Sequence, residues 1–215
     1  VYLDGDVVCA CLVAAGQASS TAAIGSGAET TVTFDFGTIS GGTLDGGVYS
    51  GATFTSNGNG TKSITLDSSN NSLQGIRDAI NAAEIGVTAS LINDGSGTPY
   101  RLVFSSDSQG ISNSMKVSVS GDAAVGSLLA HDPAGTQNLS ETVTAQNANF
   151  KLNGVAVTKT SNSVSDVLEG VTLNLYKVTS SPATLTVASD TASVGNSISR
   201  FVKAYNDLPT TLNNV

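Results

Sequence analysis

Apolar side chains in the segment from residue 194 to residue 215 recur at alternating gaps of four and three residues. This spacing is typical of the narrow seam of a coiled-coil helix, whereas a helix that lies on a globular core carries a wider apolar stripe. We therefore expect a helix from about residue 194 to residue 208 that needs a second helix to receive its seam. The residues expected in this coiled-coil or oligomer seam are Val194, Ile198, Phe201, Tyr205 and Leu208.

No other stretch of the sequence predicts a helix of comparable length. We expect the partner helix to lie outside these residues, either elsewhere in the protein or in another subunit. A terminal helix that packs on the chain's own body is the alternative. Pro209 lacks a backbone donor and disfavours helical angles at Leu208, so we expect the helix to kink or end there. The sequence begins with Val1 instead of Met, and we expect it to be a fragment of a longer protein.

Composition restricts the class of protein and its partners. Hydrophobic residues make up 40% of the chain and charged residues only 12%, so Ser, Thr, Asn, Gln and Gly must form much of its surface. Such compositions are common in secreted and surface-exposed bacterial proteins. The net charge is −8 with nine Lys and Arg residues, which argues against nucleic-acid binding. The sequence has no basic amphipathic helix and no apolar run of membrane length, so no membrane insertion is expected.

Two stretches of the sequence share one order of patterns: a strand, a capped helix, a glycine and a hairpin. In the first stretch, Asn71 or Ser72 caps a helix that Gly86 terminates. Asn93-Asp94-Gly95 supplies the turn of the hairpin. The expected elements are strands over residues 31–36, 62–67, 87–92, 100–104 and 115–119, and a helix over residues 73–83.

The second stretch is shorter and begins with a hairpin whose turn is Asn153-Gly154. Ser163 and Asp166 match a capping box, so we expect a single helical turn over residues 163–168. Residues 122–145 are expected to be a loose connection. The expected strands cover residues 150–152, 155–157, 171–175 and 183–187. Together the two stretches predict an α+β, mainly β protein with two small antiparallel-sheet domains, each with a short helix, followed by a C-terminal helical stump.

The sequence carries no recognisable motif for catalysis, a cofactor or a metal. It lacks the G-x-S-x-G elbow of a Ser nucleophile, and its single His, His131, is expected in a solvated loop. Cys9 and Cys11 would lie too far apart on a strand for an easy disulfide, and they have no further ligands for a metal. Asp4-Gly5-Asp6 lacks the run of acids that a calcium loop needs. We therefore predict a non-enzymatic protein with no catalytic residues, no cofactor and no metal.

The order and spacing of several short motifs carry a resemblance to a known family. The motifs are Leu152-Asn153-Gly154, residues 158–162, residues 166–173, Leu185-Thr186-Val187 with Asp190, residues 201–206, Leu73, residues 76–81, residues 86–89 and Arg101-Leu102. From about Gly25 to Leu208 the chain resembles the family of flagellar filament cap proteins, also called hook-associated protein 2 or FliD. The first two dozen residues, the two Cys residues and Pro209 depart from the family pattern.

This resemblance implies a structural protein of the bacterial flagellum that is exported without a cleaved signal and lies outside the cell at the filament tip. It implies a ring-shaped homo-oligomer that caps the filament and assists flagellin folding and insertion, with flagellin and other flagellar axial proteins as partners. It also implies that one domain is inserted into the other. The implied domains are an inserted β-rich outer domain over residues 25–130, a discontinuous β-rich domain over residues 1–24 and 131–190, and the start of a helical leg domain over residues 191–215.

Two other classes of function remain as alternatives. The first is an adhesin-like module that binds host glycans or mucin. The second is a secreted carbohydrate-active enzyme, which requires two carboxylates in one cleft. The acidic residues are scattered along the sequence, with no close pair that suggests glycoside hydrolysis, but folding can bring distant acids together.

Overall fold

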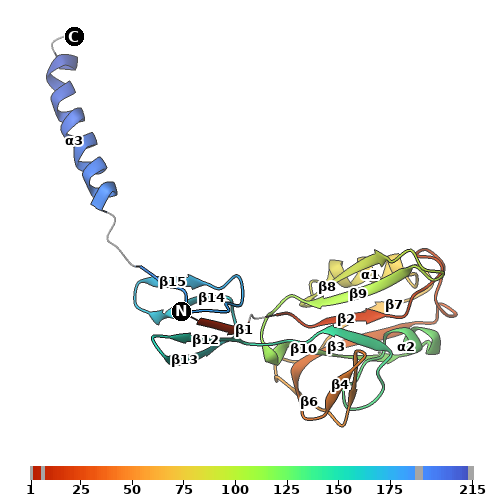
Figure 1. The fold of residues 1–215 in the computed structure, drawn as a ribbon. Helices are drawn as coiled ribbons and strands as arrows, with labels where there is room; N and C mark the ends of the chain where they lie inside the picture. The colour runs from red at the N-terminus through yellow and green to blue at the C-terminus, as the bar shows by residue number, and fades with distance from the viewer. Residues whose placement is uncertain (1, 6–7, 187–190, 213–215) are drawn as a thin grey trace. The chain divides into compact units, whose positions relative to one another are not determined.

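The computed structural model describes residues 2–5, 8–186 and 191–212. The chain divides into two compact units, Val1–Pro182 and Ala183–Val215. The first unit consists of strands with short helices, and the regular part of the second is one helix, α3 (Thr191–Leu212) (Figure 1). Over the described residues, no helix is both long enough and apolar enough to cross a lipid bilayer.

Most of the first unit is built from two four-stranded antiparallel sheets, which we call the larger lobe (residues 8–145) (Figure 1). In one sheet, β3 is central and pairs with β10 along one edge and with β6 and β7 along the other. The other sheet has the order β11-β2-β9-β8. The strands are β2 (Cys11–Ala14), β3 (Thr30–Ser40), β6 (Thr53–Ser56), β7 (Lys62–Leu66), β8 (Val87–Asn93), β9 (Tyr100–Ser106), β10 (Ser114–Ser120) and β11 (Leu139–Val143).

Side chains from both sheets meet in one hydrophobic core. Along β3, Thr30, Val32 and Phe34 are buried and the residues between them are more exposed, as the period of two along a strand requires. Phe34 packs edge-to-face against Phe104 of β9, with ring centroids 5.6 Å apart. The alternation read from the sequence therefore marks the inner face of this sheet.

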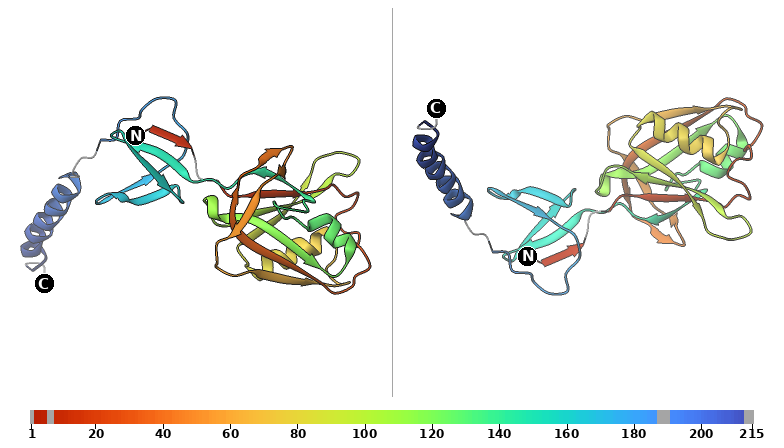
Figure 2. Two further views of the ribbon diagram at one scale, coloured as in Figure 1. Left: turned by 90° about the horizontal axis from the view of Figure 1, so that it is seen from below. Right: turned by 90° about the horizontal axis from the view of Figure 1, so that it is seen from above.

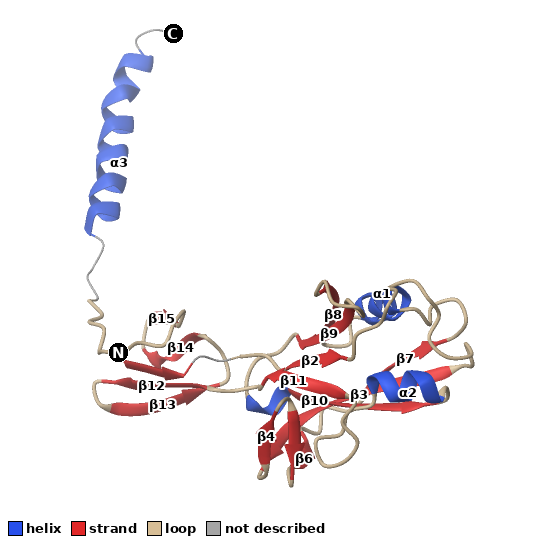
Figure 3. Cartoon of the chain, turned by 45° about the vertical axis from the view of Figure 1, so that its right-hand side comes forward, coloured by secondary structure: helices blue, strands red, loops and turns tan. Residues whose placement is uncertain are grey.

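Two helices and a short hairpin complete the larger lobe (Figures 2 and 3). Helix α1 (Leu73–Ala83) contacts β7, β8 and β9 and buries its apolar face. The side chain of Ser72 caps it by accepting a hydrogen bond from the Gly75 N–H at 3.1 Å, as predicted. The remaining elements are α2 (Ala123–Leu129), the 3₁₀ turn η1 (Ile111–Asn113), and the hairpin of β4 (Thr43–Asp45) and β5 (Val48–Ser50).

The rest of the first unit is a smaller lobe with a three-stranded and a two-stranded antiparallel sheet. Asn153 and Gly154 both have positive φ angles, 51° and 85°, as the predicted two-residue hairpin turn requires. A separate hydrophobic cluster lies in this lobe, formed by Ala148, Phe150, Val164, Leu173 and Leu175. The strands are β1 (Tyr2–Gly5), β12 (Ala148–Leu152), β13 (Val155–Lys159), β14 (Ser163–Leu168) and β15 (Val171–Asn174).

The helix predicted over residues 163–168 is wrong, because this segment is strand β14. Val164, Val167 and Leu168 are spaced as on a helix, but the same spacing arises on a strand whose register shifts. The pairing of β14 with β15 does shift between Val164 and Leu168. A single helical turn has too few hydrogen bonds to form alone, so pairing with β15 decides the conformation.

Three further segments differ from expectation. Residues 122–145 contain α2 and β11, where a loose connection was predicted. Residues 183–186 form no strand, and residue 187 lies outside the described part of the chain. Helix α3 continues past Pro209 to Leu212, so it does not end at Leu208, and a kink there stays a prediction.

The predicted fold class, α+β and mainly β with small antiparallel sheets and a C-terminal helix, is confirmed. The division into domains at residues 25, 130 and 190 stays a prediction. Strand pairing supports different limits for the inserted part, because β2 and β11 join the sheet of β8 and β9. Limits near residues 8 and 146, where Val8 and Gln146 form a β-bridge, agree better with this pairing.

Candidate assembly surface

Helix α3 presents large apolar side chains to solvent. Ile198 is 58% exposed, Phe201 72% and Tyr205 68%. Because an α-helix turns once in 3.6 residues, these three positions lie on one face. Ile198, Phe201 and Tyr205 therefore form an uncovered apolar stripe on the described part of the helix, and their role in a coiled-coil or oligomer seam stays a prediction. The side chains of Val194 and Leu208 lie outside the described residues.

The other side of α3 is polar but not uniformly so. Lys203 Nζ lies 2.6 Å from an Asp207 carboxylate oxygen, an i,i+4 pair that supports an exposed helix. Val202 is 49% exposed and does not belong to the predicted seam. An exposed aromatic and aliphatic stripe of this kind can bind the apolar face of a second helix.

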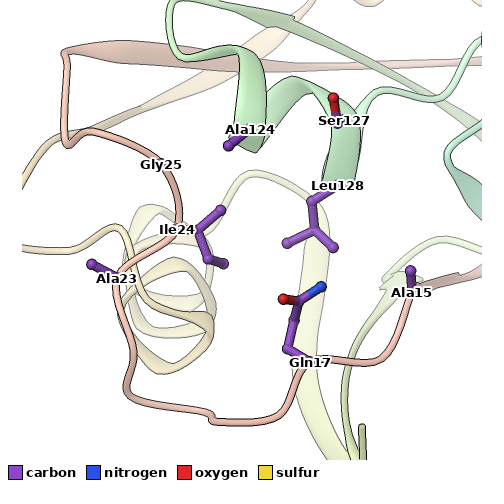
Figure 4. Close-up of a pocket in the computed structure, with 8 residues that line it drawn as sticks. All are labelled: Ala15, Gln17, Ala23, Ile24, Gly25, Ala124, Ser127 and Leu128. Atoms are coloured by element: carbon purple, nitrogen blue, oxygen red, sulfur yellow. The ribbon is translucent and has the colours of Figure 1, made fainter.

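Acidic and metal-ligating side chains do not converge in the part of the chain that the structure describes. No three His, Cys, Asp or Glu residues there lie close enough to hold a metal ion together. A cavity of about 520 Å³ opens beside α2, and small or uncharged residues line it (Figure 4). A second cavity of about 150 Å³ has Lys62 as its one titratable lining residue. Neither cavity has the paired carboxylates that glycoside hydrolysis needs.

Two aspartates with low pKa values hold turns and helix ends. Hydrogen bonds from the side chain and backbone N–H of Ser26, together with the Ala124 N–H, lower the pKa of Asp122 to about 2, and Asp122 is the N-cap of α2. Ser96 and Arg101 lower the pKa of Asp94 to about 2 in the β8–β9 turn. Both carboxylates therefore serve local structure.

His131 does not lie in a solvated loop, so that prediction is wrong. Its side chain is completely buried, and its Nδ1 donates to the Leu139 carbonyl oxygen at 3.0 Å. Its backbone bridges Val117 of β10, which draws the segment after α2 into the core. Burial lowers the pKa of His131, so the ring is held neutral.

Glu141 is a buried acidic residue that the sequence patterns did not single out. It lies on β11, two residues after Leu139 and on the same inward face. Burial raises its pKa to about 7. The spacing of Leu139 and Glu141 is visible in the sequence, but it places both side chains on one face only if residues 139–143 form a strand.

Cys9 and Cys11 have free thiols and are partly buried. Burial is the main cause that raises the pKa of Cys9, and the nearby negative charge of Asp107 adds to it. A raised pKa favours the protonated form of this thiol.

Comparison with known proteins gives consistent matches. The model of the flagellar hook-associated protein 2 C-terminus matches residues 145–215, and that of the flagellin hook IN motif matches residues 53–108. The B-type flagellar hook-associated protein 2 of Pseudomonas aeruginosa is 44% identical over 164 residues, which are 70% of this chain and 34% of that protein. The chain spans about a third of the length of the curated relatives it matches.

Solved structures are also similar. The crystal structure of the flagellar cap protein FliD D1-D2-D3 domains from Escherichia coli has a TM-score of 0.82 and 34% identity, with 98% of this chain and 56% of that chain covered. FliD (HAP2) from Pseudomonas aeruginosa PAO1 has a TM-score of 0.69 and 31% identity, with 99% of this chain and 88% of that chain covered. The similarity thus extends over both lobes and α3.

Proposed function

Because the chain belongs to the family of flagellar hook-associated protein 2, we propose that it is the β-rich part of a cap at the tip of the bacterial flagellar filament. The single observation that carries this proposal is the match of nearly the whole chain to the solved cap protein of Pseudomonas aeruginosa. In this role it works outside the cell with flagellin as its partner. It keeps flagellin subunits from escaping and assists their folding and insertion.

Self-association supplies the mechanism in this proposal. Weak contacts between copies, repeated around a closed ring, become strong together. The open stripe of Ile198, Phe201 and Tyr205 supports a coiled-coil leg in which α3 pairs with a helix outside these residues. Val194 and Leu208 extend the same seam by their spacing.

The cap acts through shape and contact, without bond-making chemistry. The cavities beside α2 and around Lys62 have no paired carboxylates, which favours this reading over a carbohydrate-active enzyme. None of the relatives described above points to a glycan-binding adhesin or to host mucin.

Gene deletion and tip labelling test the proposed function. Cells that lack the gene are expected to secrete flagellin into the medium and to carry few or no filaments, because subunits escape from an uncapped tip. An antibody against this chain should label the ends of wild-type filaments in electron micrographs. Normal filaments in the deletion strain, or label along the whole filament, would contradict the proposal.

A further inference from the structure

Glu141 occupies a core position of the larger lobe. On β11 it pairs with Leu12 of β2, which is completely buried, and Glu141 itself is only 3% exposed. Leu139 and Glu141 share the inward face, so an apolar residue would be expected at this position. The strand therefore brings a carboxyl group under the surface where the sheet would ordinarily place a Leu or Val.

The carboxyl group is poorly compensated, with the Tyr49 hydroxyl as the polar side-chain group beside it. Neither of its oxygens is exposed to solvent, and neither has a hydrogen-bond partner. Burial is the main cause that raises the pKa of Tyr49, and the charge of the nearby Glu141 carboxyl group adds to it. The Tyr49 hydroxyl partly offsets the rise in the pKa of Glu141, although their contact does not meet hydrogen-bond geometry. A buried carboxylate without partners is costly when charged, so the closed structure favours the protonated form.

The β4–β5 hairpin covers this carboxyl group and is weakly attached. It forms a two-stranded sheet of its own, and most of its residues are exposed. Gln137 holds it by accepting from the Tyr49 N–H at 2.6 Å and donating to the Tyr49 carbonyl at 2.9 Å. The Glu141 N–H donates to the Gly47 carbonyl at 2.8 Å. An element held by so few contacts can open without unfolding the lobe.

We propose that the β4–β5 hairpin is a pH-dependent flap over Glu141, closed while the carboxyl group is protonated and opened when it ionises. Opening lets water reach the carboxylate, which the closed structure leaves unsolvated. Around Glu141, Tyr49 is the titratable group on β5. Cys11 lies on the opposite face of β2 from Leu12, and His131 is buried and neutral.

Linkage gives the size of the effect. The pKa of Glu141 is about 7 in the closed form and takes its ordinary value of 4.5 in the open form. The equilibrium constant for opening of the flap therefore rises up to roughly 70-fold between pH 5 and pH 8. The direction follows from the sign of the shift: the closed form holds its proton more tightly, so raising the pH favours the open form.

Amide hydrogen exchange in the whole chain tests the flap. The amides of Glu141 and Tyr49, which make the attaching hydrogen bonds, should lose roughly 10- to 70-fold protection between pH 5 and pH 8 relative to the amide of Val32. Protection factors correct for the intrinsic pH dependence of exchange. Glu141→Gln should abolish this loss, whereas Glu29→Gln, which removes the same charge from an exposed site in the same lobe, should retain it.

Two results would overturn the proposal: equal protection of the flap amides at both pH values in the wild type, or the same loss of protection in Glu141→Gln. If Glu141→Gln does not fold, Gln137→Ala gives a second test. Removing both Gln137 hydrogen bonds favours the open flap, so the Glu141 carboxyl group should titrate at lower pH than in the wild type when followed by carbon NMR. An unchanged titration midpoint counts against the flap.

Discussion

Replacing Phe201 by Ala on α3 tests whether the exposed stripe is an interface. Phe201 is 72% exposed, and a Phe side chain offers about 200 Å² for burial, so about 140 Å² is available to a partner helix. At about 25 cal/mol per Å², covering this area contributes at most about 3.5 kcal/mol. Phe201→Ala in the full-length protein should therefore weaken helix pairing by up to roughly 400-fold.

Sedimentation equilibrium and helix unfolding followed by circular dichroism measure this effect. If the partner helix belongs to another subunit, Phe201→Ala shifts the association constant. If it belongs to the same subunit, the helical leg unfolds at lower denaturant concentration. In both cases the β lobes should keep their stability, because Phe201 is not part of either hydrophobic core.

Val202→Ala is the matched control, since Val202 lies next to Phe201 on the same helix but off the seam and is 49% exposed. It should change pairing by no more than a few tenths of a kcal/mol, as is usual for exposed sites. The reasoning is refuted if Val202→Ala weakens pairing as much as Phe201→Ala, or if Phe201→Ala leaves both measurements unchanged.

Three further predictions concern the larger lobe. Phe34→Ala should lower the free energy of unfolding by about 3–5 kcal/mol in urea titrations, because a fully buried ring leaves a cavity. Asn81→Ala should lower the free energy of unfolding by about 1–3 kcal/mol, because the Asn81 side chain donates to the Ala89 carbonyl at 2.9 Å and accepts from the Ala89 N–H at 2.7 Å. Asn81→Asp keeps the acceptor and should lower it by less. Glu141→Gln should be more stable than the wild type by up to about 3 kcal/mol at pH 8 but not at pH 4. The reason is that the raised pKa of Glu141 makes the wild type lose stability as the pH rises from about 4.5 through about 7. An equal difference in stability at both pH values contradicts this prediction.

Elements with a strong local signal were predictable from the sequence. Ser72 caps α1 as expected, and the Asn153-Gly154 turn adopts the two positive φ angles of its type. The spacing of Ile198, Phe201 and Tyr205 predicts a helix, and this segment forms α3 with the three side chains exposed. In each case neighbours within a few residues supply the hydrogen bond, the backbone angle or the periodicity.

Elements whose signal is ambiguous were not predictable. Residues 163–168 read equally well as a capped helical turn or as a strand with a register shift, and only β15 distinguishes them. The burial of His131 depends on its bridge to Val117, a residue on a distant strand. Residues 122–145 were misjudged because α2 and β11 are short and gain their stability from packing.

The sequence by itself determined the mainly β composition of the protein, its turns and caps, the family motifs and the apolar stripe of α3, since each depends on residues close together in the chain. Only the tertiary structure decided that β2 joins the sheet of β8 and β9, and that Glu141 is buried close to Tyr49. Strand pairing and burial arise from contacts between residues far apart in sequence. Those contacts exclude solvent from the Glu141 carboxyl group, and this loss of solvation raises its pKa.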